Sequence, residues 1–373
     1  MSIAKFLNSS RVKTKLDAIV DNTHAFLVDP NKEDFLKREG KRPDPKLLDQ
    51  YGMMDQYFPV VSSDDFRVLE YLFEQNKAIA SVIATGQEIP QTRMGRLLKI
   101  EGQMGKIAIS HIFGEEDEIR MMELSKMQGM PKNFVDMLIR GVDSLQPRVY
   151  KTANVLTWQC VTQGFVDYTD TRSNAAIRLR YQTYPELFPA PLTGNAVWTD
   201  YENANGVRDL REHARAFYNL NGFYPDETVM PQELADDLMS QASTRDHALA
   251  LGLISAVPGT TVQAIVDEVI LNRIAERLKF PKIRIYDAQY EIEFAPGQTV
   301  RGRYLPSHTY AFLTDGMGQR LFGPTIEGKG KPGVFVKVDE VLKSSPPESR
   351  SYAVARMFPF VPQPKLLAAR KVK

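Results

Sequence analysis

Histidine and cysteine carry much of the catalysis and metal binding found in proteins, and this sequence has few of them. The histidines are His24, His111, His213, His247 and His308. None forms a metal-binding pattern with other ligand-type residues three or four positions away, so surface or packing roles are favoured. Cys160 is the one cysteine, so no intrachain disulfide can form. It falls on the apolar face of a predicted helix, which favours a buried, unreactive thiol.

Motifs that bind phosphate or activate a serine are also missing. There is no G-x-x-x-x-G-K-[ST] loop and no G-x-S-x-G elbow. GKGKPG at 328–333 lacks the phosphate-loop spacing and a following helix. The sequence therefore predicts no enzyme activity, and no catalytic, cofactor-binding or metal residues. Pattern alone leaves open a site assembled from residues that are distant in sequence.

Charged clusters offer a different chemistry, the recognition of another macromolecule. Segment 82–114 is basic through Arg93, Arg96, Lys99 and Lys106. Its two β-rich pieces, at 95–101 and 106–113, are separated by a glycine-bounded turn at 102–105, which predicts a β-hairpin. The edges of a protruding hairpin leave backbone groups unpaired, so it often pairs with another chain. The alternative, a hairpin that folds onto its own domain and keeps its charges in solvent, is equally compatible with the sequence.

An acidic helix follows the hairpin in the sequence. Glu115, Glu116 and Asp117 open it, where negative charge suits the helix dipole, and it runs to about residue 128. Ile119, Met122 and Met127 are predicted to point inward. Composition adds little to the electrostatics, because a net charge of +1 gives no global attraction to nucleic acid or membranes.

The longest predicted element is a helix over 133–164. Seven apolar residues recur on one face, mostly three or four apart: Phe134, Leu138, Val142, Leu145, Val149, Leu156 and Cys160. Asn133 can cap its start, and Gly164 can end it. Some 31 residues would form a rod of about 46 Å. Gly141 and Pro147 lie inside it, so a kink or break near residue 147 stays open.

The remaining sequence predicts two or more subdomains, because 373 residues exceed the size at which single cores stop growing. Residues 1–60 are polar and predict an extended or partly ordered arm. A connecting helix is predicted over 61–81, beginning at 62–65. A second hairpin follows Gly164, and helices and strands alternate over 205–295, with helices starting at Asn205 and Pro231, another over 262–274 and a strand at 282–294. The chain then returns to strands.

No apolar run approaches the roughly 18 residues of a membrane span. The N-terminus lacks the apolar segment of a signal peptide. The sequence therefore predicts a soluble protein made inside the cell.

Residues 198–241 resemble the middle of the major capsid protein E family of tailed phages, the lambda-like major head proteins. The matching residues are Trp198, Ala204, Asp209, Leu210, Gly222, Pro225, Val229 and Met230. The chain departs at Gly206, where the family pattern often has proline, and at Gln163, where it has threonine. Weaker likeness at RYLPSHTYAFL and in the tail ARMFPFVPQPKLLAARKV extends the resemblance over about residues 80–373.

The resemblance implies an α+β fold of the Hong Kong 97 type. Its parts would be an N-terminal arm at 1–60, a connecting helix at 61–81 and an extended β-hairpin loop at 82–114. A peripheral domain with a long spine helix would cover 115–190, an inserted axial domain 191–330, and 331–373 would return to the peripheral domain. An arm, a basic hairpin, one long helix and an α/β insert are also what the residues themselves predict, and this agreement strengthens the assignment.

The implied function is that of the major capsid protein of a tailed bacteriophage or prophage, assembled in the host cytoplasm and located in the virion. Copies would form hexamers and pentamers of an icosahedral shell around double-stranded DNA, with scaffolding, portal and decoration proteins as further partners. An encapsulin-like compartment on the same fold and a soluble α/β enzyme are the alternatives. Size-exclusion chromatography separates the enzyme from both shells, and the contents of purified shells separate the two shells.

Two sets of residues carry the expected contacts. Arg93, Arg96, Lys99 and Lys106 of the hairpin would meet carboxylates of an adjacent copy, with Glu115, Glu116 and Asp117 as candidate partners. On the inner surface, Arg140, Arg148 and Lys151 of the spine helix are candidates to lie near packaged DNA, which they would bind without sequence preference. Local ion pairs or plain solvation are at least equal alternatives for these last three residues.

Overall fold

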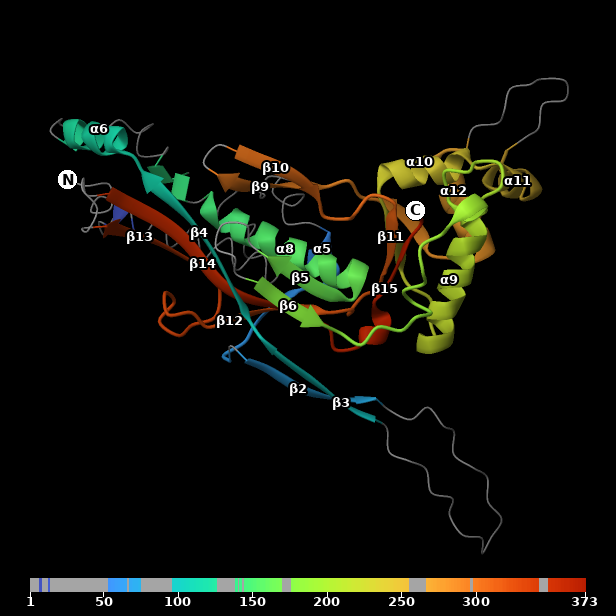
Figure 1. Cartoon of the computed structure of the whole chain (residues 1–373), viewed down its shortest axis with the longest axis horizontal. Coiled ribbons are helices and arrows are strands. Elements are labelled where there is room, and N and C mark those ends of the chain that lie inside the picture. Colours follow the sequence, from blue (N-terminus) through green and yellow to red (C-terminus); the bar gives the residue numbers. More distant parts are fainter. Residues whose placement is uncertain are drawn as a thin grey trace, which may run out of the picture.

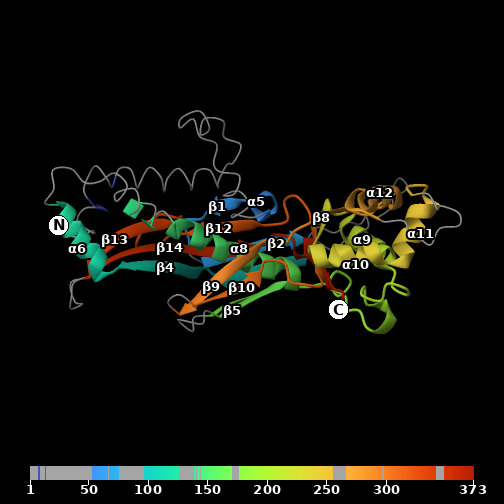
Figure 2. The ribbon, with the colours of Figure 1, turned by 90° about the horizontal axis from the view of Figure 1, so that it is seen from above.

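The structure is an elongated molecule with one β-sheet near each end (Figures 1 and 2). It is a computed structural model, and it describes residues 7–8, 13, 53–65, 67–74, 96–125, 138–139, 141–142, 144–169, 176–254, 266–295, 298–341 and 348–373. Helix α8 lies along the first sheet, and helices α9 to α12 surround the second.

The first sheet is organised around β14 (Glu348–Phe360), the longest strand described. One edge of β14 pairs with β13 (Phe335–Val341) and then with β12 (Gln319–Gly323), both antiparallel. The other edge pairs over nine residues with β4 (Gly105–Phe113). Strand β1 (Val60–Ser62) adds parallel to β12.

Helix α8 (Leu145–Gln163) packs on β14 and β4 and is buried on most of its surface. Gly164 ends it as predicted, in the left-handed region at φ 72°, and its N–H donates to Cys160 O at 2.9 Å. A continuous 31-residue rod is not present: α8 has 19 residues, and residues 138–139 and 141–142 before it are also helical, in line with the break near residue 147 that the sequence left open. Pro147 lies in its first turn, where no backbone donor is needed, so proline marks the start of the helix.

Two predictions for residues 61–113 are wrong. In place of the helix at 61–81, the structure has strand β2 (Arg67–Glu74), which pairs antiparallel with β3 (Arg96–Gln103). A short, nearly continuous apolar run fits either element, and here the partner strand decides. In place of the turn at 102–105, only Met104 separates β3 from β4, so the chain runs on from the β2–β3 pair into the first sheet without reversing.

The second sheet has the order β15-β11-β7-β8, with bounds Ala368–Lys371, Thr309–Leu313, Glu227–Met230 and Lys282–Ile285. Strands β7 and β8 are parallel, and the other pairs are antiparallel. All five side chains of β11, the strand between β7 and β15, are buried.

Helices cover this sheet, with bounds Gly206–Asn221 for α9, Gln232–Ser240 for α10, Ala242–Ala250 for α11 and Glu268–Leu278 for α12. Asn205 caps α9 as predicted, because its side chain accepts from Arg208 N at 3.0 Å. The helix predicted at 262–274 is wrong in its bounds. Asp267 caps α12 by accepting from Ile270 N at 2.7 Å, and residues 255–265 lie outside the described part.

Contacts within residues 198–241, the stretch that resembles the capsid family, explain several of its residue types. Trp198 is buried and donates to Asp209 Oδ2 at 3.0 Å. At position 206, where the family pattern often has proline, the N–H of Gly206 donates to Gln241 Oε1 at 2.8 Å. Proline has no N–H and could not form this hydrogen bond. A Cβ at position 206 would also lie 2.5 Å from Leu238. Glycine is therefore the residue that fits this helix start.

Two hairpins complete the described fold. Strands β5 (Phe165–Thr169) and β6 (Ala176–Arg180) confirm the hairpin predicted after Gly164. The single strand predicted at 282–294 is wrong, because β8 ends at Ile285 and β9 (Gln289–Ala295) pairs instead with β10 (Gln298–Arg303). Between β8 and β9, Tyr286 stacks on Trp158 of α8, with ring centroids 5.1 Å apart.

Most buried apolar residues belong to one core that includes α8 and both sheets. A second, smaller cluster lies at the end where α6 (Glu115–Ser125) begins, and includes Phe113, Met121 and Val338. Leu7 belongs to it, with 1% of its surface exposed, and the Asn8 amide donates to Val338 O at 2.7 Å. Met54, Tyr57 and Phe58 belong to the main core as well, so parts of the arm predicted over 1–60 contribute to the core of the protein.

Sheet membership crosses two of the predicted domain boundaries. Strand β12 falls within 191–330 but pairs with β14 of the first sheet. Strand β15 falls within 331–373 but pairs with β11 of the second sheet. The last residues of the chain therefore bind the two ends of the molecule together, which strand patterns alone do not predict.

Candidate self-assembly interface

The β2–β3 pair is a separate two-stranded ribbon, and among the described strands no other pairs with either member. It projects away from the first sheet (Figure 1). Its register joins eight pairs of residues, from Arg67 with Gln103 to Glu74 with Arg96. An isolated two-stranded ribbon is marginally stable in water, so contact with a further surface would stabilise it.

The described basic residues of the predicted hairpin do not lie on one hairpin, because they belong to two different sheets. Arg96 and Lys99 lie in β3, in register with Glu74 and Tyr71, and the structure describes only their backbone. Arg93 lies outside the described residues. Arg96 and Lys99 therefore belong to the ribbon, whereas Lys106 belongs to the first sheet through β4.

Lys106 has a partner within its own chain. Its Nζ donates to Glu327 Oε1 at 2.7 Å. This hydrogen bond is the largest cause that holds the pKa of Glu327 below its usual value. The structure thus offers Glu327, rather than the carboxylates at 115–117, as the contact of Lys106. The pair is partly exposed, so it contributes at most about 1 kcal/mol.

The predicted acidic residues lie in the first turn of α6, as expected. The side chains predicted to be buried on this helix are exposed instead. Glu115 and Glu116 are exposed, and Asp117 Oδ2 accepts from Gly114 N at 3.3 Å. Ile119 and Met122 are each 48% exposed, which corrects the inward orientation predicted for them. Met121 points inward instead. Residue 127 lies outside the described part.

The candidates for the inner surface lie at one end of α8. Arg148 is exposed and Lys151 is partly exposed, one turn apart on an otherwise mostly buried helix. Arg140 lies outside the described residues. The structure therefore places two of the three candidate cations at the start of α8, with Arg148 exposed and Lys151 partly exposed.

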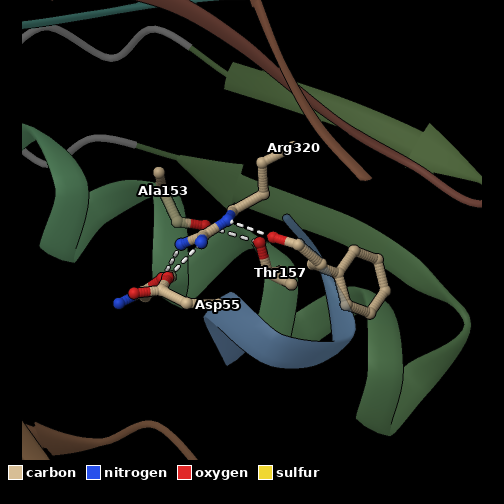
Figure 3. Close-up of polar contacts among 6 residues, drawn as sticks. Asp55, Ala153, Thr157 and Arg320 are labelled. Carbon is tan, nitrogen blue, oxygen red and sulfur yellow. Dashed lines mark hydrogen bonds and ion pairs between the residues drawn. The ribbon is translucent and has the colours of Figure 1, made fainter. Parts of the chain in front are cut away.

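Arg320 forms a polar site that sequence patterns do not predict (Figure 3). It is 1% exposed and lies on β12. Its Nε donates to Phe58 O at 2.8 Å and its Nη1 to Asn154 Oδ1 at 2.6 Å, while Nη2 forms an ion pair with Asp55. Burial raises the pKa of Asp55, and Arg320 opposes that rise. One guanidinium therefore joins α5 (Met54–Tyr57), α8 and β12.

His213 and Cys160 are both buried in the core region. His213 Nε2 lies 3.1 Å from Leu187 O, which can only accept, so Nε2 carries the proton and Nδ1 accepts from Tyr310 Oη at 3.0 Å. Burial lowers the pKa of His213 to about 4. Cys160 is fully buried, and burial raises the pKa of its thiol far above neutrality. The thiolate needed for nucleophilic chemistry is therefore not populated.

Across the described residues, no group of three or more histidine, cysteine or acidic side chains is arranged to hold a metal ion. The helices in those same ranges include none that combines the length and apolarity of a membrane span.

A solved structure with the same fold comes from a prophage. It is a chain assigned as a capsid protein in Escherichia coli CFT073, with a TM-score of 0.53 and 12% sequence identity, covering 86% of this chain and 92% of that one. A phage-related protein of Bordetella bronchiseptica RB50 has a TM-score of 0.46 and 11% identity over 88% and 95% of the two chains. A chain of the satellite phage P4 procapsid has a TM-score of 0.44 and 10% identity over 97% of each.

No protein-family model matches the chain. A curated relative, methyltransferase pvhD of Talaromyces variabilis, is 22% identical over 171 residues, which are 45% of this chain and 44% of that protein. The chain thus spans less than half the length of this relative, and so short and distant a match shows no shared family. The likeness to the prophage protein defines the class: the chain has the fold of a phage capsid protein.

Proposed function

We propose that this chain is the major capsid protein of a tailed bacteriophage or prophage, with a fold of the Hong Kong 97 type. The observation that carries the proposal is the likeness to the prophage capsid chain over most of both lengths. In this assignment the first sheet with α8 is the peripheral domain, and the second sheet with α9 to α12 is the axial domain. The β2–β3 ribbon is the extended loop.

The ribbon supports self-assembly because its register pairs apolar positions of the two strands and no other described strand pairs with it. Its register places Leu72 opposite Leu98 and Phe73 opposite Leu97. Successive pairs in a ribbon alternate between its two faces, so both faces have apolar positions. A neighbouring copy is the surface that would stabilise such a ribbon. Arg96 and Lys99 would add ion pairs there, each contributing about 0–1 kcal/mol.

The shell would consist of hexamers and pentamers around double-stranded DNA, with Arg148 and Lys151 of α8 facing the packaged genome. Contacts of this kind bind phosphates without reading sequence. Arg140 belongs to the same proposal but lies outside the described residues. Scaffolding, portal and decoration proteins are the further partners, assembly takes place in the host cytoplasm, and the product is a virion component.

The test is to express the full chain and examine it by size-exclusion chromatography and negative-stain microscopy. Closed shells are expected, and elution as a monomer or small oligomer at all concentrations would refute the proposal. The contents of the shells then identify their type. Nuclease-protected DNA of defined length in particles from induced cells is expected, whereas shells that hold only a protein cargo would indicate an encapsulin-like compartment.

A further inference from the structure

The loop between β12 and β13, residues 324–333, has a well-defined conformation that its own hydrogen bonds maintain. Pro324 and Pro332 form a β-bridge at its base. Its backbone donor–acceptor pairs are Lys329 N to Ile326 O, Gly330 N to Thr325 O and Lys331 N to Gly328 O, at 2.9, 2.9 and 3.1 Å. The hydroxyl of Thr325 accepts from Gly328 N at 3.1 Å. Few backbone donors of the loop remain to bind water.

Contacts with the first sheet hold this loop in place. The ion pair between Glu327 and Lys106, at 2.7 Å, joins it to β4. Gly328 lies against the ring of Phe335, where an added Cβ would be 2.3 Å from Cε2. Lys329 takes the left-handed region at φ 55°, which a side chain with a Cβ adopts only at an energetic cost. The sequence GKGK thus builds a rigid loop rather than a phosphate loop.

This rigid loop exposes a large apolar side chain. Ile326 is 86% exposed, more than any other large apolar residue in the described part of the chain. Lys329 and Lys331 are exposed beside it. A preorganised loop loses little conformational entropy on binding, so an apolar group at its tip is well suited to anchor a partner. The surface that fits it would be apolar, with negative charge alongside.

Helix α6 of the same chain presents such a surface. Glu115, Ile119 and Met122 are spaced i, i+4 and i+7, which places them on one face. Ile119 and Met122 are each 48% exposed, and Glu115 and Glu116 are exposed next to them. The loop offers an isoleucine with two cations, and the helix offers two apolar side chains with two anions.

The two surfaces cannot meet within one copy. Lys106 holds the loop near one end of β4, and Phe113 at the other end leads into α6. Seven residue steps separate Lys106 from Phe113 along the strand. At about 3.3 Å per residue, the two attachment points are roughly 23 Å apart. A contact between them therefore requires a second copy of the chain.

We infer that the Ile326 loop of one copy docks on the exposed face of α6 in a neighbouring copy. Because a loop meets a helix, the interface joins two different surfaces and can repeat from copy to copy around a ring. The inference rests on the proposed function and adds to it a named contact, separate from the β2–β3 ribbon.

Disulfide trapping tests the contact directly in the full-length protein. Ile326→Cys is combined with Ile119→Cys or with Met122→Cys, and the variants are oxidised and run on non-reducing gels. Cys160 gives no background, because it is fully buried. A ladder of linked copies is expected for at least one double variant and not for the single variants. Val300→Cys with Ile119→Cys is the matched control, since Val300 is also an exposed apolar residue, at 57%.

The gels are read for both the particle fraction and the soluble fraction. Particles without a ladder in either double variant would overturn this contact and leave the capsid assignment standing. Absence of particles, with no ladder in concentrated soluble protein, would count against both. A ladder in soluble protein that forms no particles would support the contact and count against the shell.

Substitutions measure the strength of the contact. Burying an isoleucine changes an equilibrium constant roughly 10- to 100-fold, so Ile326→Asp is expected to raise the concentration needed for assembly by at least tenfold. Val300→Asp is expected to leave it unchanged. Lys329→Glu with Lys331→Glu should weaken assembly, and adding Glu115→Lys with Glu116→Lys should restore it. Unchanged assembly in Ile326→Asp, or no restoration by the reversed charges, would overturn the inference.

Discussion

Replacing Arg320 by methionine is expected to destabilise the subunit more than any surface arginine replacement. Methionine keeps most of the aliphatic volume but donates no hydrogen bond. It leaves the Asn154 and Phe58 oxygens without this donor and the Asp55 carboxylate without its ion-pair partner. Breaking a buried pair in this way typically costs about 3–5 kcal/mol, because the remaining charge is uncompensated.

The size of the effect can be converted to temperature. The entropy of unfolding is about 2.1 cal/mol/K per residue, which is roughly 0.8 kcal/mol/K for a chain of this length. Each kcal/mol lost then lowers Tm by about 1.3 °C, so Arg320→Met should lower Tm by roughly 4–6 °C. Urea denaturation of unassembled subunits, followed by tryptophan fluorescence, gives the free energy independently.

Two further variants make the reasoning refutable. Arg301→Met removes an exposed arginine whose ion pair with Glu291 lies in solvent, so it should cost less than about 1 kcal/mol. Arg320→Met combined with Asp55→Asn removes both charges, and should recover part of the loss seen with Arg320→Met alone. If Arg320→Met unfolds within about 1 kcal/mol of the unmodified protein, the buried guanidinium does not join α5, α8 and β12 as described.

Three further predictions concern pH, the ribbon and the α8 cations. The pKa of His213 falls from about 6.5 unfolded to about 4 folded, so its stabilisation is complete above pH 6.5 and is lost as the pH falls toward 4. The loss is about 2 kcal/mol by pH 5; His213→Gln should lack this component, and equal pH profiles would contradict the assignment. Replacing residues 75–95 by a Gly-Ser link should leave a folded subunit, by circular dichroism, that forms no shells; normal shells would refute the ribbon's role. Arg148→Glu with Lys151→Glu should lower the nucleic acid held per particle, and normal content in stable particles would refute a DNA contact.

The boundaries of β3 and β4 determine where the ribbon can be shortened without damage to the first sheet. A deletion over 97–109, within the hairpin that the sequence predicts, would remove seven of the eight residues of β3 and five of the nine residues of β4, including the buried Ile107. Such a variant would fail to fold for reasons unrelated to assembly. The cut at 75–95 leaves β2, β3 and β4 intact.

Local signals in the sequence were sufficient for elements whose stability is local. The cap at Asn205, the buried face of α9 and its end at Gly222 all follow from residues within one helix. The same holds for Gly164 at the end of α8 and for the β5–β6 hairpin, because capping and hairpin formation depend on near neighbours. The sequence also predicts that Cys160 is buried on the apolar face of its helix, which the structure confirms.

Tertiary structure decided which strands pair and which charges are buried. The run at 67–74 fits a helix or a strand by its pattern, and only pairing with β3 makes it a strand. Lys106 meets Glu327 across 221 positions, and Arg320 meets Asp55 across 265. Such partners are chosen by the packing of distant segments, which no local periodicity encodes. An arginine in GQRLFG reads as a surface residue until the fold places it between α5, α8 and β12.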